Sequence, residues 1–276
     1  MIIRGDARQL PLRPATVQCV VTSPPYFQLR DYPCGPRQLG REATPAAYVA
    51  TLREVFREVR RVLRSDGVLW LILGDSYWNP RARDPGVKRK DLIGIPWRVA
   101  LALQADGWYL RADIIWHKPN PMPDGARDRP SRAHEHVFLL SKSRRYYYNA
   151  DAIAEPAVSD HPSGKRGRGR SGRDHGQRGV NTGWMNIGGQ RNRRDVWPIA
   201  SEPTSAAHYA TFPAELALLC LLAGSRSGDL VLDPFAGSGT VAAVAEKTSR
   251  RWIGIERAAE YVTLACQRTA QIGLPF

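Results

Sequence analysis

The sequence has few cysteines, only four among 276 residues. They lie far apart, at Cys19, Cys34, Cys220 and Cys266, and form no C-x-x-C pair. Structural zinc sites and redox-active disulfides usually need closely spaced thiols. The spacing therefore argues against a metal site and a redox pair, and we expect buried free thiols in a reducing compartment.

Long apolar stretches are also missing. The longest candidate, Leu216 to Ala223, ends at Gly224, whereas a helix needs about 18 apolar residues to cross a bilayer. Residues 1–6 lack the charged and apolar segments of a secretory signal. We therefore expect no membrane partner and a cytoplasmic location.

Acidic residues are scarce relative to basic ones. The chain has 26 Asp and Glu against 40 Lys and Arg, which gives a net charge of +14 and a pI of about 10.1. Such an excess attracts polyanions and raises the rate of encounter with a phosphate backbone. The charge predicts a nucleic-acid partner, with a basic but unspecialised surface as the alternative.

Strand and helix patterns alternate over most of the chain. Apolar residues from Val49 to Leu63 recur on one helical face, and Thr44-Pro45 supplies a cap and a first-turn proline. We expect helices at 45–63, 95–104, 213–223, 240–247 and 258–269, and strands at 17–22, 68–73, 109–116, 137–140, 146–148, 230–232 and 252–255. This alternation predicts an α/β fold with a mostly parallel sheet.

The alternation stops at about residue 156. Between His161 and Asp195 there are nine Lys or Arg, nine Gly and two acids. The segment carries +7, half of the net charge, and has too few apolar residues to fold alone. We therefore divide the chain into residues 1–156, a basic insertion at 157–195, and residues 196–276.

A glycine-rich turn follows a strand near the end of the chain, in Leu230-Val-Leu-Asp-Pro-Phe-Ala-Gly-Ser-Gly-Thr240. Gly237 and Gly239 let backbone N–H groups approach a ligand. Glu256 ends the next strand, where a carboxylate can bind the ribose hydroxyls of an adenosine-containing cofactor. The chain has neither a full G-x-G-x-x-G nor a G-x-x-x-x-G-K. Helix–strand packing is the alternative role for the turn.

Thr22-Ser23-Pro24-Pro25-Tyr26 ends the first long strand. Two consecutive prolines restrict the backbone and are expected to leave their carbonyls without internal partners. A rigid loop with a hydroxyl, free carbonyls and an aromatic ring suits recognition of a planar amine. Taken alone, the same residues also fit a plain turn.

Together the two motifs resemble those of the amino-methyltransferases of bacterial restriction–modification systems, in their β arrangement. There the (S/D/N)-P-P-(Y/F) motif precedes the target-recognition region and D-P-F-x-G-S-G-T comes last, as in this chain. Further matches are Gly5-Asp6, Phe212-Pro213 with Glu215-Leu216, and Ile253-Gly-Ile-Glu256. The resemblance implies a Rossmann-like fold that uses S-adenosyl-L-methionine, with helices on both faces of the sheet and a basic target-recognition insertion.

The resemblance also implies a role for each motif. Ser23, Pro24, Pro25 and Tyr26 would be catalytic: Ser23 and the Pro24 carbonyl would accept both hydrogens of an exocyclic amine, and Tyr26 would stack on a flipped base. The cofactor site would consist of Asp6, Phe212, Pro213, Asp233, Pro234, Phe235, Gly237, Ser238, Gly239, Thr240 and Glu256. The insertion would bind double-stranded DNA through Lys165, Arg166, Arg168, Arg170, Arg173, Arg178, Arg191, Arg193 and Arg194.

Serine at the first motif position implies N4 of cytosine as the target, with N6 of adenine as the alternative. A cognate restriction endonuclease acting separately, and a monomeric or homodimeric state, are further implications. A C5-cytosine enzyme would need a nucleophilic cysteine after a proline, and Pro33-Cys34 is displaced from the strand end. A non-enzymatic DNA-binding protein would explain the charge but not the two motifs. A methyltransferase for RNA or a small molecule would have less use for the insertion.

Three other groups of polar residues carry weaker expectations. Asp75 follows the 68–73 strand and is expected to stabilise a turn, with a role beside the base as the alternative. His117 and the His134-Glu135-His136 run are expected in loops or facing DNA. Histidines at i,i+2 without cysteine partners make a weak metal site, and direct methyl transfer needs no metal.

Overall fold

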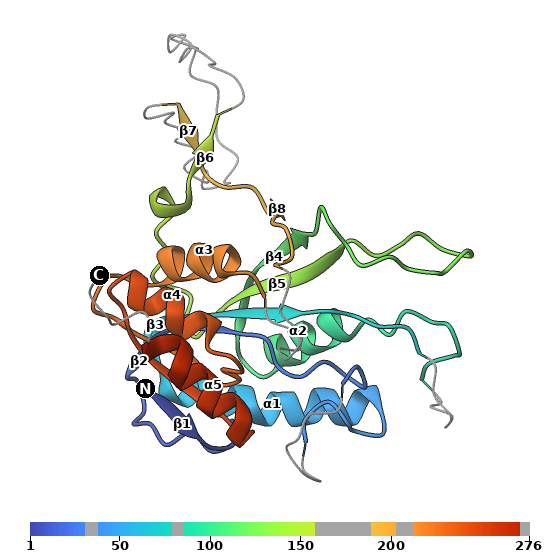
Figure 1. Ribbon diagram of the computed structural model, residues 1–276, viewed down its shortest axis with the longest axis horizontal. Coiled ribbons are helices and arrows are strands. Elements are labelled where there is room, and N and C mark those ends of the chain that lie inside the picture. Colours follow the sequence, from blue (N-terminus) through green and yellow to red (C-terminus); the bar gives the residue numbers. More distant parts are fainter. Residues whose placement is uncertain (31–37, 79–85, 158–188, 203–211, 271–276) are drawn as a thin grey trace, which may run out of the picture.

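The computed structural model describes residues 1–30, 38–78, 86–157, 189–202 and 212–270. Its centre is an eight-stranded sheet with the order β1-β10-β9-β2-β3-β5-β4-β8 (Figure 1). β9 and β10, from the end of the chain, lie between β1 and β2, so both ends of the sequence build one sheet. A separate antiparallel pair, β6 (Glu155–Pro156) and β7 (Gln190–Arg191), joins the two flanks of the basic insertion.

Five neighbouring strands run parallel and form what we call the parallel half of the sheet. They are β1 (Ile2–Arg4), β10 (Arg251–Glu256), β9 (Leu230–Asp233), β2 (Val17–Thr22) and β3 (Leu63–Leu73). Parallel strands are covered on both faces, and all six residues of β2 are buried. The carboxyl ends of these strands meet at one edge of the sheet, and the loops that leave this edge carry both predicted motifs.

The other strands form the antiparallel half of the sheet. They are β5 (His134–Ser141), β4 (Tyr109–His117) and β8 (Val196–Pro198). β5 runs antiparallel to both β3 and β4, while β8 runs parallel to β4. His136 pairs with Leu73, and His134 pairs with His117. The start of β5 therefore lies at the same edge as the carboxyl ends of β3 and β4.

Helices cover both faces of the sheet (Figure 1). They are α1 (Pro45–Val62), α2 (Ile95–Ala105), α3 (Ala214–Gly224), α4 (Thr240–Lys247) and α5 (Ala259–Ala270), with a 3-10 turn, η1, at Asp151–Ile153. α1 and α2 pack against one face of the sheet, and α3 and α4 pack against the other. α5 lies beside β1 and α4. Two apolar cores therefore form, one on each side of the sheet.

Helix α1 begins as its sequence predicts. Thr44 Oγ1 accepts a hydrogen bond from the Ala47 N–H at 3.1 Å, and Pro45 occupies the first turn. Phe56 and Val59 are completely buried against the sheet. The helix ends at Val62, one residue earlier than predicted, because Leu63 already pairs with Val17 at the start of β3.

The structure confirms the mostly parallel α/β sheet with helices on both faces and all but one of the predicted elements. The predicted strand at 146–148 is wrong. These tyrosines lie in an irregular loop, in which Tyr147 N donates to the Asp66 carbonyl and the ring of Tyr148 contacts Trp70. The Tyr148 ring thus packs on Trp70 of β3, and none of the three tyrosines pairs with a strand. Within the described ranges, no helix is long and apolar enough to cross a membrane.

The cysteines follow the prediction only in part. Cys19 and Cys220 are buried, and burial raises the pKa of both thiols. Cys266 is exposed on α5, contrary to the prediction. Pro33-Cys34 lies outside the described residues.

Candidate active site

A recess opens at the edge where the parallel strands end, between the loops that follow β1, β2, β9 and β10. The empty space within it, including its open mouth, is about 980 Å³. We call it the glycine-turn recess. Its walls include Asp6, Ser23, Pro25, Phe212, Asp233, Pro234, Phe235, Gly237, Ser238, Thr240 and Glu256.

The glycine-rich turn between β9 and α4 forms one wall. Gly237 and Gly239 have positive φ angles of 49° and 82°, which glycine adopts without strain. Gly239 precedes α4, and a Cβ there would lie 3.2 Å from Ala265 Cβ. Gly239 therefore lets α5 pack closely, and it does not line the recess, although the sequence analysis placed it at the cofactor.

Glu256, the last residue of β10, is fixed by backbone N–H groups. Its Oε2 accepts a hydrogen bond from Gly237 at 2.9 Å, and its Oε1 accepts from Arg257 and Ala258 at 2.8 Å. A carboxylate oxygen can accept more than one hydrogen bond. The group is thus rigidly placed beside the glycine turn and retains acceptor capacity toward the recess.

Asp233 links the two motifs. Its Oδ1 accepts from the Thr22 hydroxyl at 2.7 Å and from the Phe235 N–H at 3.0 Å. Thr22 is the last residue of β2 and immediately precedes Ser23. Burial raises the pKa of Asp233 to about 7, against the opposing effect of these hydrogen bonds. The ends of β9 and β2 are therefore locked together by a buried carboxyl group.

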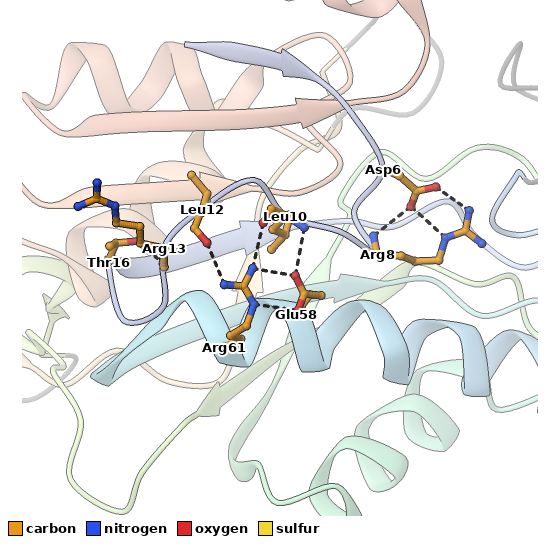
Figure 2. Close-up of polar contacts among 8 residues, drawn as sticks. All are labelled: Asp6, Arg8, Leu10, Leu12, Arg13, Thr16, Glu58 and Arg61. Atoms are coloured by element: carbon orange, nitrogen blue, oxygen red, sulfur yellow. Dashed lines mark hydrogen bonds and ion pairs between the residues drawn. The ribbon is translucent and has the colours of Figure 1, made fainter.

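Asp6 lies in the loop after β1 (Figure 2). Arg8 binds both of its carboxylate oxygens, with Nη2 to Oδ2 at 2.6 Å and Nε to Oδ1 at 2.9 Å. The hydrogen bonds from Arg8 hold the pKa of Asp6 below its usual value. Arg61 of α1 donates to the carbonyls of Leu10 and Leu12 at 2.9 and 2.8 Å. The loop that carries Asp6 is thus anchored to α1.

A second recess adjoins the first, and we call it the proline-loop recess. It is lined by Ser23, Pro24, Tyr26, Leu29, Arg30, Trp116, Lys118, Glu135, Ser201 and Phe212. Ser23 and Phe212 line both recesses. A ligand in one recess and a ligand in the other would therefore approach each other at these two side chains.

Two residues that were not predicted as part of the site, Tyr48 and Gly40, contact the backbone of the proline loop. Tyr48 of α1 donates its hydroxyl to the Pro25 carbonyl at 2.8 Å, so this carbonyl has an internal partner, contrary to the prediction. A Cβ at Gly40, whose φ is 89°, would lie 2.8 Å from the Tyr26 carbonyl. Only glycine fits this close approach, which fixes the path of the loop.

Tyr26 is held at both its ring and its hydroxyl. The hydroxyl donates to Glu135 Oε2 at 2.5 Å, and the Lys118 ammonium binds the other Glu135 oxygen. At Gly74, just after β3, a Cβ would lie 2.6 Å from the ring atom Cε2, so the missing side chain makes room for the ring. Burial and the negative charge of Glu135 raise the pKa of Tyr26 well above its ordinary value.

Neither Lys118 nor Glu135 was among the predicted site residues. Lys118 follows β4 and lies 4.3 Å from the centre of the Trp116 ring, an arrangement that a cation and an aromatic face favour. Glu135 is the second residue of β5. Glu135 lies between two histidines, a pattern that suggests metal ligands. The signal that could have identified Glu135 as a site residue is a charged side chain at the start of a strand whose later residues are apolar.

Asp75 stabilises the turn before α2, as predicted. Its oxygens accept from the N–H groups of Ser76, Gly94 and Ile95 at distances between 2.9 and 3.0 Å. The residue lines neither recess. Pro213 also lines neither and instead caps the start of α3.

The histidines differ from the expectation of loop positions, because His117 ends β4 and His134 and His136 lie in β5. His136 Nδ1 lies 2.9 Å from Asp113 Oδ1. Desolvation lowers the pKa of His134. In the part of the chain that the structure describes, no three His, Cys, Asp or Glu side chains are grouped to hold a metal ion.

The predicted DNA-binding residues fall into two groups. Lys165, Arg166, Arg168, Arg170, Arg173 and Arg178 lie outside the described residues. Arg191 and Arg194 both donate to Glu155 Oε1, at 2.9 and 2.6 Å, and Arg193 donates to the Ile153 carbonyl at 2.8 Å. Their guanidinium groups thus anchor the base of the insertion, and the Arg194 side chain is still 65% exposed.

The fold is that of an α/β protein with two recesses that join at one edge of its sheet. The chain belongs to the DNA methylase family with N6 and N4 members, whose model, described as DNA methylase, matches residues 17–267. It is 46% identical to the Type II methyltransferase M.SmaI of Serratia marcescens, over 97% of this chain and 89% of that protein. It is 42% identical to M.Cfr9I of Citrobacter freundii, over 97% and 86%.

Solved structures agree with this assignment. The PvuII DNA methyltransferase, described as cytosine-N4-specific, matches with a TM-score of 0.70 and 20% identity, over 98% of this chain and 89% of that one. At this identity the likeness shows the fold alone. A putative DNA modification methylase of Thermus thermophilus, solved in complex with S-adenosyl-L-methionine, matches with a TM-score of 0.65 and 27% identity over 100% and 95%. The resemblance inferred from the sequence is thus confirmed at the level of the family.

Proposed function

We propose that this protein transfers a methyl group from S-adenosyl-L-methionine to the exocyclic N4 amine of cytosine in DNA. The observation that carries the proposal is the junction of the two recesses at Ser23 and Phe212. A donor beside the glycine turn and a base beside the proline loop would meet there. Membership of the DNA methylase family supplies the reaction class.

The residues of the glycine-turn recess fit S-adenosyl-L-methionine. Glu256 would accept hydrogen bonds from the ribose hydroxyls, and Asp6 would accept from the adenine amine. The missing Cβ at Gly237 leaves room beside the backbone. Phe212 would flank the methionine end, with Pro213 holding it from the start of α3. The bound cofactor supplies a methyl group on a positively charged sulfur.

The wall of the same recess would be completed by the rest of the glycine-rich motif. Asp233 would act through its hydrogen bonds to Thr22 and Phe235, which place the loop. Gly239 would act through the packing of α5 rather than by direct contact. The remaining contacts would come from Pro234, Phe235, Ser238 and Thr240.

The proline loop would bind the target base. An exocyclic amine is a poor nucleophile because its lone pair is delocalised into the ring. Ser23 Oγ and the Pro24 carbonyl would accept its two hydrogens and free the lone pair, and the Tyr26 ring would stack on the base. Pro25 would keep the loop rigid through its contact with Tyr48. Catalysis would rest on positioning and on fixed dipoles, and the base would have to leave the duplex.

Serine at position 23 supports cytosine N4 over adenine N6, because the family resemblance associates serine in this motif mostly with N4 targets. The carboxamide or carboxylate that adenine enzymes mostly carry is absent from this position. N6 of adenine is the second candidate. A DNA-binding protein without activity is disfavoured by the family and by the joined recesses.

The basic insertion at 157–195 is proposed as the target-recognition region between the two segments 1–156 and 196–276. Its nine basic residues would contact phosphates and guanine edges. Arg191, Arg193 and Arg194 would hold its base through their contacts with Glu155 and Ile153. A separate restriction endonuclease of the same specificity would act on the unmethylated site, and the methyltransferase would work as a monomer or homodimer.

Product analysis tests the proposal. The purified protein is incubated with DNA and isotope-labelled S-adenosyl-L-methionine, and the DNA is digested to nucleosides and analysed by mass spectrometry. Labelled N4-methylcytosine is the expected product. Labelled N6-methyladenine would replace the proposed base, and an absence of any labelled nucleoside would reject the enzymatic assignment.

A variant pair assigns the activity to the proline loop. Ser23→Ala should lower the rate of methyl transfer about 100-fold, the size of effect seen when one positioned polar group is removed from an active site. Donor binding should change little. Ser65→Ala, at an exposed position before the buried part of β3, is the control and should behave like wild type. Equal rates for Ser23→Ala and wild type would refute the assignment.

A further inference from the structure

Glu135 is a nearly buried acid that the proposed function does not use. Its side chain is 16% exposed and lines the proline-loop recess. One carboxylate oxygen accepts from the Tyr26 hydroxyl and the other binds the Lys118 ammonium, whose side chain is 21% exposed. Burying charged groups is costly unless they are paired and positioned. The arrangement therefore calls for a role.

The topology of the sheet explains how Glu135 reaches the active edge. β5 runs opposite to its neighbours, so its second residue pairs with Trp116, near the carboxyl end of β4. Lys118 comes immediately after β4. Gly74 follows β3, at a position where a Cβ would lie 3.4 Å from Glu135 Cδ. Three strand ends thus bring the acid to the proline loop.

The Tyr26 hydroxyl contacts Glu135 directly. It donates to Glu135 Oε2 at 2.5 Å. Ser23, Tyr26 and Glu135 line the same recess, and an interaction with the Ser23 side chain opposes the rise in the pKa of Tyr26. A Ser23 hydroxyl that donates to Tyr26 Oη would present its oxygen lone pairs to the recess.

We infer that Glu135 ends a hydrogen-bond chain that starts at Ser23 and passes through Tyr26, and that this chain takes up the proton which the target amine loses. The inference rests on the proposed function, because it concerns the proton released by methyl transfer to an amine. It adds Glu135 as a positioning residue that acts on the amine only through the two hydroxyl groups.

Each group in the hydrogen-bond chain accepts one proton and passes one on. As the amine nitrogen bonds to the methyl carbon, the carbon–sulfur bond breaks and its electron pair stays on sulfur, so the nitrogen holds one proton in excess. This proton passes to Ser23 Oγ, the Ser23 proton passes to Tyr26 Oη, and the Tyr26 proton passes to Glu135 Oε2. Both hydroxyl groups are restored. Glu135 becomes a neutral carboxylic acid and returns its proton to water through its exposed edge.

A carboxylate is a strong enough base for this task. A methylated exocyclic ammonium is very acidic, because losing the proton restores conjugation between nitrogen and ring. Lys118 forms an ion pair with Glu135 and so compensates the negative charge of the partly buried carboxylate. The charged and titratable groups that face Glu135 are Tyr26 from the proline loop, Lys118 after β4, Arg30 across the recess and His134 on the same strand.

The test compares Glu135→Gln with Glu54→Gln, an exposed position on α1, under single-turnover conditions with saturating donor and DNA. Glu135→Gln should transfer the methyl group about 100-fold more slowly than wild type, the usual contribution of a positioned base. Glu54→Gln should transfer the methyl group at the wild-type rate. A wild-type rate for Glu135→Gln would overturn the inference.

Two further measurements separate the chain from a merely structural role. Tyr26→Phe keeps the ring and breaks the chain, so Tyr26→Phe combined with Glu135→Gln should be no slower than either single variant; multiplied losses would overturn the inference. If Glu135→Gln alone does not fold, Glu135→Gln with Lys118→Met removes the unpaired charge, and the same slow transfer is expected of it.

The hydrogen-bond chain is also observable without donor or DNA. The ¹³C resonance of Tyr26 Cζ in the free protein should shift in Glu135→Gln and in Ser23→Ala, and should stay in place in Glu54→Gln. An unshifted resonance in the first two variants would overturn the chain itself. A wild-type protein that shows the chain but forms no methylated DNA would instead reject the proposed function.

Discussion

The two halves of the sheet contribute to the active site in different ways. The parallel half supplies the glycine-turn recess through loops that leave consecutive strand ends, with Asp233 at the end of β9 and Glu256 at the end of β10. The antiparallel half supplies one wall of the proline-loop recess through Trp116, Lys118 and Glu135. These three come from strands that run in opposite directions.

The difference indicates that the two halves of the sheet have different roles in the site. Carboxyl ends of parallel strands gather at one edge, which is where α/β folds bind cofactors. The reversal at β5 brings a strand start to that edge and so adds side chains that a purely parallel sheet would place at the far side. We expect changes around the glycine turn to affect stability and donor binding, and changes at the proline loop and in the antiparallel half to affect the transfer step.

The largest effect is expected from the buried acid of the parallel half. Asp233 has a pKa of about 7 in the folded protein, above the value of about 3.9 for an unfolded chain. The folded state therefore holds the proton more tightly, and the free energy of unfolding falls as pH rises from about 4 to 7. Asp233→Asn keeps an acceptor for Thr22 and removes the titration. Relative to this variant, wild type should lose up to about 4 kcal/mol across the window.

Urea unfolding of both proteins at several pH values measures this difference. Glu260→Gln, an exposed change on α5, serves as the control and should follow wild type at every pH. A free energy of unfolding with the same pH dependence in Asp233→Asn and wild type would show that the buried carboxyl group does not titrate in this range.

The next effect concerns donor binding. Glu256→Ala removes the proposed acceptor for the ribose and also releases Gly237 from the end of β10. We expect the dissociation constant for S-adenosyl-L-methionine to rise about 100-fold, because one or two hydrogen bonds to a charged group are lost. Isothermal titration calorimetry gives the constant, with Glu260→Ala as control. An unchanged donor affinity would show that Glu256 does not bind the cofactor. It would also contradict the expectation that the glycine turn governs donor binding.

β3 is the boundary strand, because it pairs with β2 of the parallel half and with β5 of the antiparallel half. A change at its end should slow methyl transfer and leave donor binding unchanged. A Cβ at Gly74 would lie 2.6 Å from the Tyr26 ring, so Gly74→Ala should displace the ring and lower the single-turnover rate roughly 10- to 100-fold. Donor affinity should stay within about twofold of wild type, since Gly74 does not line the glycine-turn recess. Gly125→Ala has no atom within 4 Å of the added Cβ and should keep the wild-type rate. A loss of donor affinity in Gly74→Ala would contradict the comparison.

The same contrast explains how much the sequence could predict. The residues of the glycine turn and of the proline loop are contiguous, and their local conformation is set by Gly237, Pro24 and Pro25. Because parallel strands bring their carboxyl ends together, the joining of the two motifs followed from the fold class. The sequence therefore predicted four of the five parallel strands and the five helices, and nine of the eleven residues assigned to the cofactor site line the glycine-turn recess.

The antiparallel half was harder to predict, since its contribution depends on strand order. Lys118 and Glu135 are 17 residues apart, and they meet because β5 pairs with β4 in a particular register. The hydrogen bond from the Tyr48 hydroxyl to the Pro25 carbonyl is likewise a tertiary contact, which the local sequence does not reveal. The aromatic run at 146–148 suggested a strand, but no neighbouring strand edge pairs with it among the described residues.

The smallest effect is expected from Asp75, which follows the boundary strand and belongs to neither recess. Its carboxylate accepts from the N–H groups of Gly94 and Ile95 at the start of α2. Asp75→Ala leaves these groups without a protein acceptor and should cost about 1 kcal/mol, the usual loss for a helix cap. The melting temperature should fall by about 2 to 4 °C.

Calorimetry on Asp75→Ala, with the exposed Asp151→Ala as control, measures this fall. Donor affinity and the single-turnover rate should both remain within a few-fold of wild type, because the carboxylate holds the turn before α2 and does not line either recess. A rate loss as large as that of Gly74→Ala would mean that Asp75 acts on the base. The loop after β3 would then contribute a residue that contacts the base, and Asp75 would belong with the residues that affect the transfer step.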